Sequence, residues 1–247
     1  HMEDELTQAL RMFAQHKWPF RIHATYNESA ERMLNVIESV HSETPLTGPW
    51  LFDHAETFSP QTLDRIKALG GAVAIQNRML FQGEYFVQRY GKKTAAQAPP
   101  VRAMLDREIP VALGTDGTRV SSYNPWLALY WLTTGKTWGG LKHLADENIL
   151  SRREALKTMT HASARFTGEE NQKGTIDPGK FADFAILAED YFTVEAEALK
   201  DMEAVLTVVD GRIAYGSGEY QDLDPELPPL RPDWSPVHYY GGYAGRR

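Results

Sequence analysis

Three polar residues of the chain each come directly after a short, β-prone apolar segment: His23, His54 and Asp116. Imidazole nitrogens and carboxylate oxygens are ligands of Zn²⁺ and of similar divalent ions. A carboxylate beside such an ion can also act as a general base toward water. The chain has no cysteine, so disulfide bonds, thiolate metal sites and cysteine nucleophiles are excluded together. If the fold brings the three side chains together, they predict a metal-assisted site.

The spacing of these residues favours that arrangement. His23 and His54 are 31 residues apart, and Asp116 follows 62 residues later, twice that interval. A (β/α)₈ barrel of about 250 residues has about 31 residues in each βα unit. In enzymes with this fold, the active site lies at the carboxyl ends of the strands. The competing interpretation is structural, because a histidine at a strand end is often simply hydrogen-bonded and Gly114-Thr115-Asp116-Gly117 is typical of an Asx turn.

The elements needed to position these residues alternate along the first 140 residues. We expect β-prone strands at residues 20–22, 50–52, 72–75 and 110–114. Helical patterns occupy residues 3–15, 27–40, 59–69, 101–108 and 125–134. Asn27 and Ser59 are expected to be N-caps, and the polar residues 77–97 are expected to form a loop. Strands that alternate with helices predict parallel βαβ units.

The pattern changes after residue 140. Ser151 and Glu154 have the spacing of a capping box, which predicts a helix that runs to Phe166. Asp210-Gly211 is typical of a two-residue hairpin turn between antiparallel strands. The short strands expected in this part of the chain are at residues 181–187, 205–209 and 212–215. From Pro225 onward the chain is rich in proline, glycine and tyrosine, which predicts an extended arm.

Composition excludes several classes of function. The chain has 247 residues and carries 33 acidic against 26 basic side chains, a net charge of −7, so it offers no basic surface for nucleic acid. No apolar run approaches the 18 or so residues of a membrane span, which predicts a soluble chain without a membrane partner. His1-Met2 is typical of a cloning remnant. The compartment therefore stays unknown, with the cytoplasm as the default and export not excluded.

The remaining histidines and the aromatic residues near Asp116 give weaker evidence for a functional site. The histidines expected to be solvated are His16, His41, His143 and, in the tail, His238. His161 is expected to cap a helix end. The aromatic residues beyond Asp116 hint at an apolar or aromatic substrate group, although helix packing explains them equally well or better: Tyr123, Trp126, Tyr130 and Trp131.

Several segments resemble the metal-dependent amidohydrolases. The segments around the three residues read Phe20-Arg21-Ile22-His23-Ala24, Phe52-Asp53-His54-Ala55-Glu56 and Leu113-Gly114-Thr115-Asp116. The run from Gly174 to Leu187 is similar to the superfamily pattern G-x-(I/L)-x-P-G-(K/M)-x-A-D-x-x-(V/I)-L. The resemblance covers about residues 10–216 and is strongest to family 3, which includes enzymes similar to N-substituted formamide deformylases and N-acyl-D-amino-acid deacylases.

This resemblance implies an α/β fold, the C-terminal half of a (β/α)₈ TIM-type barrel (strands 5–8) plus the C-terminal strands of a small β-sandwich. It divides the chain into residues 1–168 (half-barrel), 169–218 (sandwich share) and 219–247 (extended tail). It implies that His23 and His54 are the metal ligands of strands 5 and 6. Asp116 would bind the metal-activated water, take its proton and hand it to the leaving nitrogen of a small amide-type substrate. Gln76 and Asn77 would lie near enough to contact the substrate, with hydrogen bonding within the loop as an equal alternative. Arg119 is placed at the mouth of the pocket, where surface packing explains it equally well.

The sequence also departs from the family pattern. Members of this branch commonly read H-A-x-G-D after strand 5, whereas this chain has His23-Ala24-Thr25-Tyr26-Asn27. No H-x-H pair occurs anywhere in the chain, so the ligand set for Zn²⁺ or another divalent metal is incomplete. We therefore expect the missing N-terminal half to be a separate chain, or two copies to associate, and the isolated chain to be inactive. The alternatives are a non-catalytic, amidohydrolase-like binding or regulatory protein and a purely structural fragment.

Overall fold

The computed structural model describes residues 2–117 and 121–226 and contains a parallel and an antiparallel β-sheet. Arg119 and the tail from residue 227 onward lie outside the described residues. The first part of the chain forms α1 (Met2–His16), β1 (Phe20–Ala24), α2 (Asn27–Glu43), β2 (Trp50–His54), α3 (Pro60–Ala68), β3 (Ala72–Gln76), α4 (Arg78–Ala95), α5 (Val101–Asp106), β4 (Val111–Gly114) and α6 (Pro125–Thr134). The second part forms α7 (Arg152–Met159), α8 (His161–Phe166), β5 (Phe184–Leu187), β6 (Ala204–Val209) and β7 (Arg212–Gly216), with short 3₁₀ turns η1 (Asp146–Asn148), η2 (Ala196–Asp201) and η3 (Gly218–Leu223).

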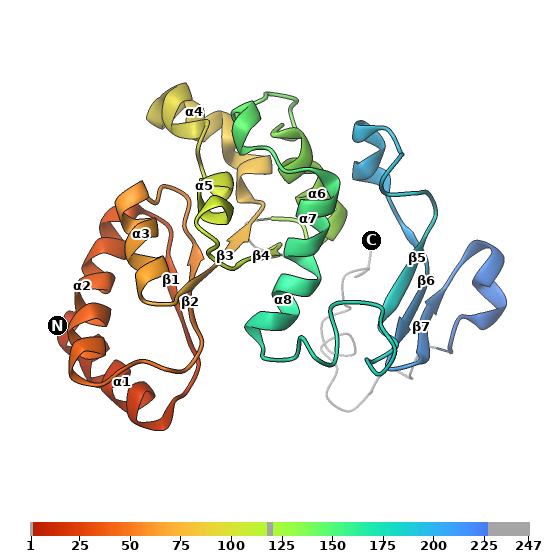
Figure 1. Cartoon of the computed structure of the whole chain (residues 1–247). Coiled ribbons are helices and arrows are strands. Elements are labelled where there is room, and N and C mark those ends of the chain that lie inside the picture. Colours follow the sequence, from red (N-terminus) through yellow and green to blue (C-terminus); the bar gives the residue numbers. More distant parts are fainter. Residues whose placement is uncertain (1, 118–120, 227–247) are drawn as a thin grey trace, which may run out of the picture.

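The first four strands form a parallel sheet in the order β1-β2-β3-β4, as the alternating pattern predicts. Their core-facing residues are apolar and buried, for example Phe52, Val73 and Ile75, which lie between the sheet and its helices. Figure 1 shows α2 and α3 flanking β1 and β2, α7 and α8 beside β4, and the second sheet standing beyond α8. Because all three strand pairs are parallel, the carboxyl ends of the four strands lie at one edge of the sheet.

The expected loop at residues 77–97 is wrong, because the structure has helix α4 there. Its buried residues Met79, Leu80, Gly83 and Phe86 recur at helical spacing within a polar segment. Gly83 packs so closely that a Cβ atom would lie 2.5 Å from Cγ2 of Thr137. The helix is kinked at Gly91, where φ is 83°. The glycines and exposed polar residues of this segment are typical of a loop, so the sequence pattern did not predict a helix that is stabilised by tertiary contacts.

Two other local expectations need correction. The helix after Ser151 is interrupted at Thr160, where the backbone leaves the helical region, and it forms α7 and α8 instead of one element. Asn27 is not an N-cap, since Tyr26 takes that position without a side-chain cap bond and Asn27 is the first residue of α2. Ser59 does cap α3, as predicted, and accepts a hydrogen bond from the Thr62 amide.

The antiparallel sheet has the order β5-β6-β7. Asp210 and Gly211 form the expected hairpin turn, with positive φ angles of 51° and 72°. Strand β5 begins at Phe184, three residues later than the apolar pattern predicts, since residues 181–183 turn by local hydrogen bonds. Within the described residues, no helix is both long and apolar enough to cross a membrane.

Candidate active site

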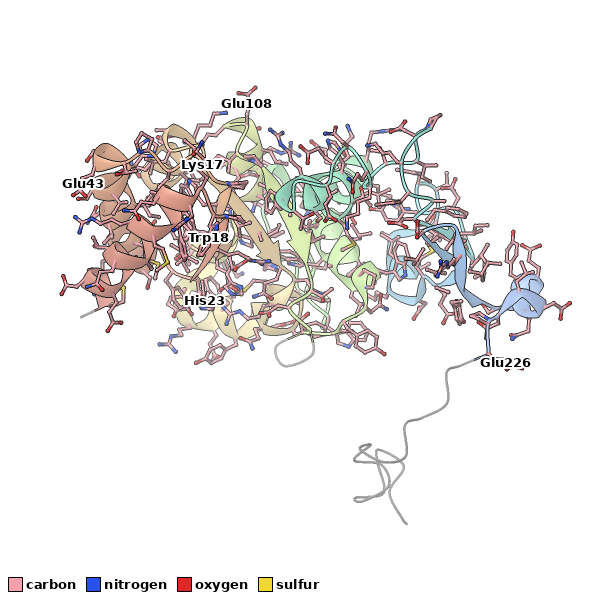
Figure 2. All side chains as sticks on the ribbon, turned by 90° about the horizontal axis from the view of Figure 1, so that it is seen from below. Lys17, Trp18, His23, Glu43, Glu108 and Glu226 are labelled. Carbon is pink, nitrogen blue, oxygen red and sulfur yellow. The ribbon has the colours of Figure 1, made fainter. Side chains whose placement is uncertain are left out.

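His23 and His54 lie at the carboxyl ends of neighbouring parallel strands. Nε2 of His54 is 2.8 Å from Nδ1 of His23, and the ring centroids are 4.3 Å apart. Figure 2 shows His23 at the opposite end of the sheet from Lys17 and Glu108, the residues that lead into β1 and β4. The structure therefore brings the two histidines together at the edge where the sequence pattern places them.

The backbone is left-handed at the residues of this edge. The φ angle is 81° at His54, 52° at Ala55 and 49° at Asp116. Because His23 pairs with Asp53 in the register, a regular strand would point His54 toward the opposite face of the sheet. The left-handed turn carries its ring over the strand end to His23. Such backbone costs about 1–3 kcal/mol per non-glycine residue and collects at functional sites, which favours a functional interpretation of this edge.

The electrostatics of the pair keep His54 neutral. Burial lowers the pKa of His54 below its ordinary value of 6.5, and repulsion from His23 lowers this pKa further. The carboxylates that act in the opposite direction are those of Asp116, Asp53 and Glu56. Nδ1 of His54 is buried and has no hydrogen-bond partner among the described residues. A neutral imidazole is the form that binds a metal ion, so this environment suits a ligand.

Asp116 follows β4 and is exposed at the same edge. Its charge acts on His54, and the Gly117 amide donates a hydrogen bond to Oγ1 of Thr115, which holds the turn. Over residues 2–117 and 121–226, no three His, Cys, Asp or Glu side chains gather closely enough to hold a metal ion. The two imidazoles fit Zn²⁺ or another divalent transition metal as donors, but the set is short of a complete coordination shell. Arg119, the expected substrate contact beyond Asp116, lies outside the described residues.

Two ion pairs beside the histidines were missed by the sequence interpretation. Glu56 is only 2% exposed and pairs with Arg78, whose Nε donates to it at 2.7 Å. Arg21 donates through Nε to Asp53 at 3.2 Å, across the first two strands. Asp53, Glu56 and Arg78 follow the same rule that identified the histidines, since they are polar residues at or just past strand ends, whereas Arg21 is the second residue of β1. The Glu56–Arg78 pair joins the loop after β2 to the first residue of α4 and so fixes the backbone next to His54.

Gln76 and Asn77 are buried at the carboxyl end of β3. Oε1 of Gln76 accepts the Arg78 amide at 3.0 Å, and Oδ1 of Asn77 accepts the Ser121 hydroxyl at 2.7 Å. Nδ2 of Asn77 has no partner among the described residues. The structure therefore places both side chains near the edge but uses their oxygens to hold the neighbouring loops.

His143 is not solvated, contrary to the sequence interpretation. It is 5% exposed, its Nε2 accepts a hydrogen bond from Nε1 of Trp131 at 2.9 Å, and its Nδ1 lies 3.2 Å from the Ala95 carbonyl. Burial lowers its pKa below 6.5. Tyr130 and Trp131 are fully buried in α6, so these two aromatic residues are core residues and do not line a substrate pocket. His161 begins α8 and is exposed.

Comparison with known proteins identifies the family. The sequence profile of the amidohydrolase family, in its family 3 branch, matches residues 1–215. The chain belongs to this family. It is 26% identical over 196 residues to the N-substituted formamide deformylase of Arthrobacter pascens, an alignment that covers 78% of this chain and 36% of that protein.

Solved structures share the fold of this amidohydrolase chain. An uncharacterized metal-dependent hydrolase from Pyrococcus horikoshii matches with a TM-score of 0.68 and 21% identity, over 79% of this chain and 39% of the other. The atrazine chlorohydrolase TrzN of Arthrobacter aurescens, complexed with zinc, matches with a TM-score of 0.62 and 21% identity, over 92% of this chain and 49% of the other. The chain thus spans less than half the length of each of these relatives.

The departure from the family pattern after β1 has a structural role in this amidohydrolase. Oδ1 of Asn27 accepts hydrogen bonds from the Ser59 amide at 2.8 Å and from the Thr62 hydroxyl at 2.7 Å. Its Nδ2 donates to Glu31 at 2.8 Å. Asn27 therefore fastens the loop after β1 to the cap of α3, and the His23 and His54 loops are held as one unit.

Proposed function

We propose that this chain is the C-terminal half of a (β/α)₈ barrel, in which β1 to β4 are strands 5 to 8. The observed chain order of four parallel strands supports this assignment, as does the match to 49% of a zinc-containing relative by 92% of this chain. In the same proposal, residues 1–168 form the half-barrel, residues 169–218 form the C-terminal share of a β-sandwich and residues 219–247 form a tail. The antiparallel sheet β5-β6-β7 supports the sandwich assignment.

The function that the geometry supports best is hydrolysis of an amide-type C–N bond by the complete, metal-dependent protein. The observation that carries it is the approach of His54 Nε2 to His23 Nδ1, at 2.8 Å, on a strained strand edge within the electrostatic reach of Asp116. His23, His54 and Asp116 are the residues of this chain that would hold Zn²⁺ or another divalent metal. The relative named as an N-substituted formamide deformylase suggests a small amide as the substrate.

A bound divalent metal would supply Lewis acidity, which makes water a stronger acid. The chain's own contribution is positioning and proton transfer. Burial and repulsion from His23 lower the pKa of His54, and the loop contacts of Asn27 and Glu56 hold the two histidines close together. Asp116, exposed at the same edge, takes a proton from water and returns it to the leaving nitrogen, so that the C–N bond breaks and a carboxylic acid and an amine form.

The other predicted contacts are assigned to the substrate. Nδ2 of Asn77 is a buried donor without a partner among the described residues and is suited to a substrate carbonyl oxygen. Gln76 lies next to it, and Arg119 belongs to the loop that follows Asp116. These three assignments rest on position at the carboxyl edge, where barrel enzymes bind their substrates.

The chain also needs a protein partner in this proposal. The edge strands β1 and β4 each pair with a single strand among the described residues, which leaves backbone groups open for further strands. A cavity of about 1010 Å³, lined by apolar residues such as Trp126, Leu156 and Phe184, lies between the helices beside β4 and the second sheet. Covering these surfaces is the role of the missing N-terminal half or of a second copy, and the isolated chain is expected to be inactive.

Complementation tests the proposal. The chain is expressed with a segment that supplies the N-terminal half of a family relative, and zinc content and hydrolysis of an N-substituted formamide are measured. The expected result is that the mixture binds zinc and hydrolyses the amide, whereas each part alone does not. If the mixture forms a stable complex that neither takes up metal nor hydrolyses amides, the hydrolase assignment fails. Metal uptake without hydrolysis of any amide would favour the alternative, a binding or regulatory protein, whose supporting observation is Asn27 in place of the family's aspartate.

A further inference from the structure

The Thr25 hydroxyl lies beside the ring nitrogen of His23 that does not face His54, and no step proposed above uses it. Oγ1 of Thr25 is 3.3 Å from Nε2 of His23, whereas Nδ1 of His23 faces Nε2 of His54 at 2.8 Å. Within residues 2–117 and 121–226, Thr25 is the only hydrogen-bond partner of Nε2 of His23. In the family pattern H-A-x-G-D, Thr25 stands at the position x, so the pattern assigns it no role.

The surrounding backbone holds Thr25 in this position. Side chains two residues apart in an extended chain point to the same side, which brings the Thr25 hydroxyl to the His23 ring. The Thr25 carbonyl oxygen accepts a hydrogen bond from the Glu56 amide at 2.9 Å, and Glu56 in turn pairs with Arg78. Thr25 is half-buried, and its β-branched side chain is restricted in χ1. The hydroxyl is therefore a fixed neighbour of His23.

The partners of the ring nitrogens determine where the two histidines carry their protons. A neutral imidazole has one N–H, so one of the two facing nitrogens must donate and the other must accept. Nδ1 of His54 is buried without a partner among the described residues, and proteins avoid an orphaned buried N–H more strictly than an unpaired acceptor. In the neutral pair, His54 therefore donates from Nε2 to Nδ1 of His23. The proton of His23 is then on Nε2, which donates to the Thr25 hydroxyl.

This tautomer is the one that His23 needs as a metal ligand. The nitrogens that can share an ion are the two that face each other, Nδ1 of His23 and Nε2 of His54. A ligating nitrogen carries no proton, and a metal-bound histidine donates its other N–H to an acceptor that fixes the ring. For His23 the chain supplies that acceptor in Thr25. Nδ1 of His54 has no such acceptor in the described part of the chain, so the preparation is confined to His23.

We propose that Thr25 is a positioning residue for metal binding, whose hydroxyl holds the proton of His23 on Nε2 and so keeps Nδ1 free for the ion. Thr25 acts through His23 and takes no part in making or breaking bonds. The link to a metal rests on the proposed hydrolase function, whereas the tautomer of His23 is a property of the chain by itself.

NMR of the isotope-labelled full chain tests the tautomer without metal or substrate. Correlations between ring protons and ring nitrogens distinguish the two neutral tautomers, and the spectrum of His23→Ala identifies the His23 signals. At a pH where the ring is neutral, we expect the form with the proton on Nε2 to dominate in the wild type. Thr25→Val keeps the shape but removes the hydroxyl, so it should shift the ratio of tautomers about two- to fivefold, the size of one partly exposed hydrogen bond. Thr25→Ser should restore the ratio.

Zinc affinity of the complemented protein gives a second measurement. Thr25→Val should weaken zinc binding about tenfold, as loss of an outer partner of a ligand does, and Thr25→Ser should keep it. Thr57→Val is the matched control, because the Thr57 hydroxyl lies in the neighbouring loop and accepts the Asn27 amide at 3.0 Å instead of contacting a histidine. Thr57→Val should leave the ratio of tautomers and the zinc affinity unchanged.

Three results overturn the proposal: a wild-type His23 that carries its proton on Nδ1, a ratio that Thr25→Val leaves unchanged, or an equal shift in Thr57→Val. A loss of zinc affinity that Thr25→Ser does not restore overturns it as well, because packing and not the hydroxyl would then be responsible.

Complementation separates this inference from the function on which it rests. If the mixture neither binds zinc nor hydrolyses amides while the His23 tautomer still follows the Thr25 hydroxyl, the hydrogen bond stands and the hydrolase function fails together with the metal role of Thr25. If the mixture is active while tautomer and zinc affinity are independent of Thr25, the hydrolase function stands and the positioning role fails.

Discussion

Two histidine sites in this chain differ in how the ring nitrogens of the histidines are hydrogen-bonded. At the carboxyl edge of the parallel sheet, His23 and His54 face each other through ring nitrogens, and φ at His54 is 81°. Nδ1 of His54 is buried and has no hydrogen-bond partner within residues 2–117 and 121–226. Between α4 and α6, His143 is buried with both ring nitrogens within hydrogen-bond distance of Trp131 and Ala95.

The difference teaches how to distinguish a functional histidine from a structural one. The partners of His143 are an indole N–H and a backbone carbonyl, which fix one neutral tautomer and leave nothing for a ligand. In the His23–His54 pair, Nδ1 of His54 has no hydrogen-bond partner among the described residues, and His54 sits on backbone that costs energy to maintain. Burial alone does not separate the two sites, since burial lowers the pKa of both His54 and His143.

The largest effect is expected from Asp116→Asn in the complemented enzyme. The amide keeps the size and shape of the side chain but cannot accept a proton, so kcat should fall about 10²- to 10⁴-fold. Because Asp116 is exposed, the thermal midpoint should stay within the range of ordinary surface changes. Steady-state kinetics and a thermal melt measure the two quantities. A variant with full turnover would exclude the proton-transfer role.

Metal affinity gives the next test of the comparison. Loss of a residue that only hydrogen-bonds a metal ligand lowers metal affinity by about 10- to 100-fold. His54→Ala removes a proposed ligand itself, so it should weaken zinc binding of the complemented protein by more than that. His143→Ala should leave zinc affinity unchanged, because its ring nitrogens already have partners. Competition with a chromogenic chelator measures both constants. Equal affinities in the two variants would remove the distinction between the histidine sites.

For the free energy of unfolding, we expect the larger effect at His143 and the smaller one at the histidine pair, the reverse of the order for zinc affinity. His143→Ala leaves a cavity and an unpaired indole N–H on Trp131, so we expect a loss of about 2–4 kcal/mol in the free energy of unfolding. His23→Ala removes an exposed ring and should change the free energy by less than about 0.5 kcal/mol. Urea unfolding of the isolated chain measures both. A larger loss at His23 would show that the strand edge serves the fold.

The smallest effect is a pH dependence of stability. The pKa of His143 is lowered in the folded chain, so the unfolded chain binds its proton more readily as pH falls. Stability should be intact above the ordinary value of 6.5 and decline below it, by up to about 1.4 kcal/mol per pH unit for each proton taken up. Urea unfolding between neutral and mildly acidic pH measures the slope. His143→Gln, which cannot be protonated there, should have a shallower slope, and an unchanged slope would contradict this assignment.

Local rules predict much of the fold from the sequence. The four strands of the parallel sheet, the Ser59 cap and the Asp210-Gly211 turn each depend on residues close together in the chain, so short-range patterns suffice. The predicted places of His23 and His54 followed from the same patterns, because parallel strands bring their carboxyl ends to one edge whatever surrounds them.

Contacts between distant residues decided the rest. Helix α4 exists because its buried stripe packs on the segment around Thr137 and His143, although its sequence reads as a polar loop. Asn27 was expected to be an N-cap, but it connects the loop after β1 to α3 because Ser59 lies beside it in space. The Glu56–Arg78 ion pair was not predicted because the two residues are 22 positions apart in the chain.

The sequence by itself therefore determined the order of the strands and the edge at which the chemistry lies. The tertiary structure alone decided which histidine has both ring nitrogens within hydrogen-bond distance of partners and which backbone bears strain. The physical reason is that hydrogen bonds, burial and charge pairing depend on neighbours in space, whereas strand and helix patterns depend on neighbours in the chain.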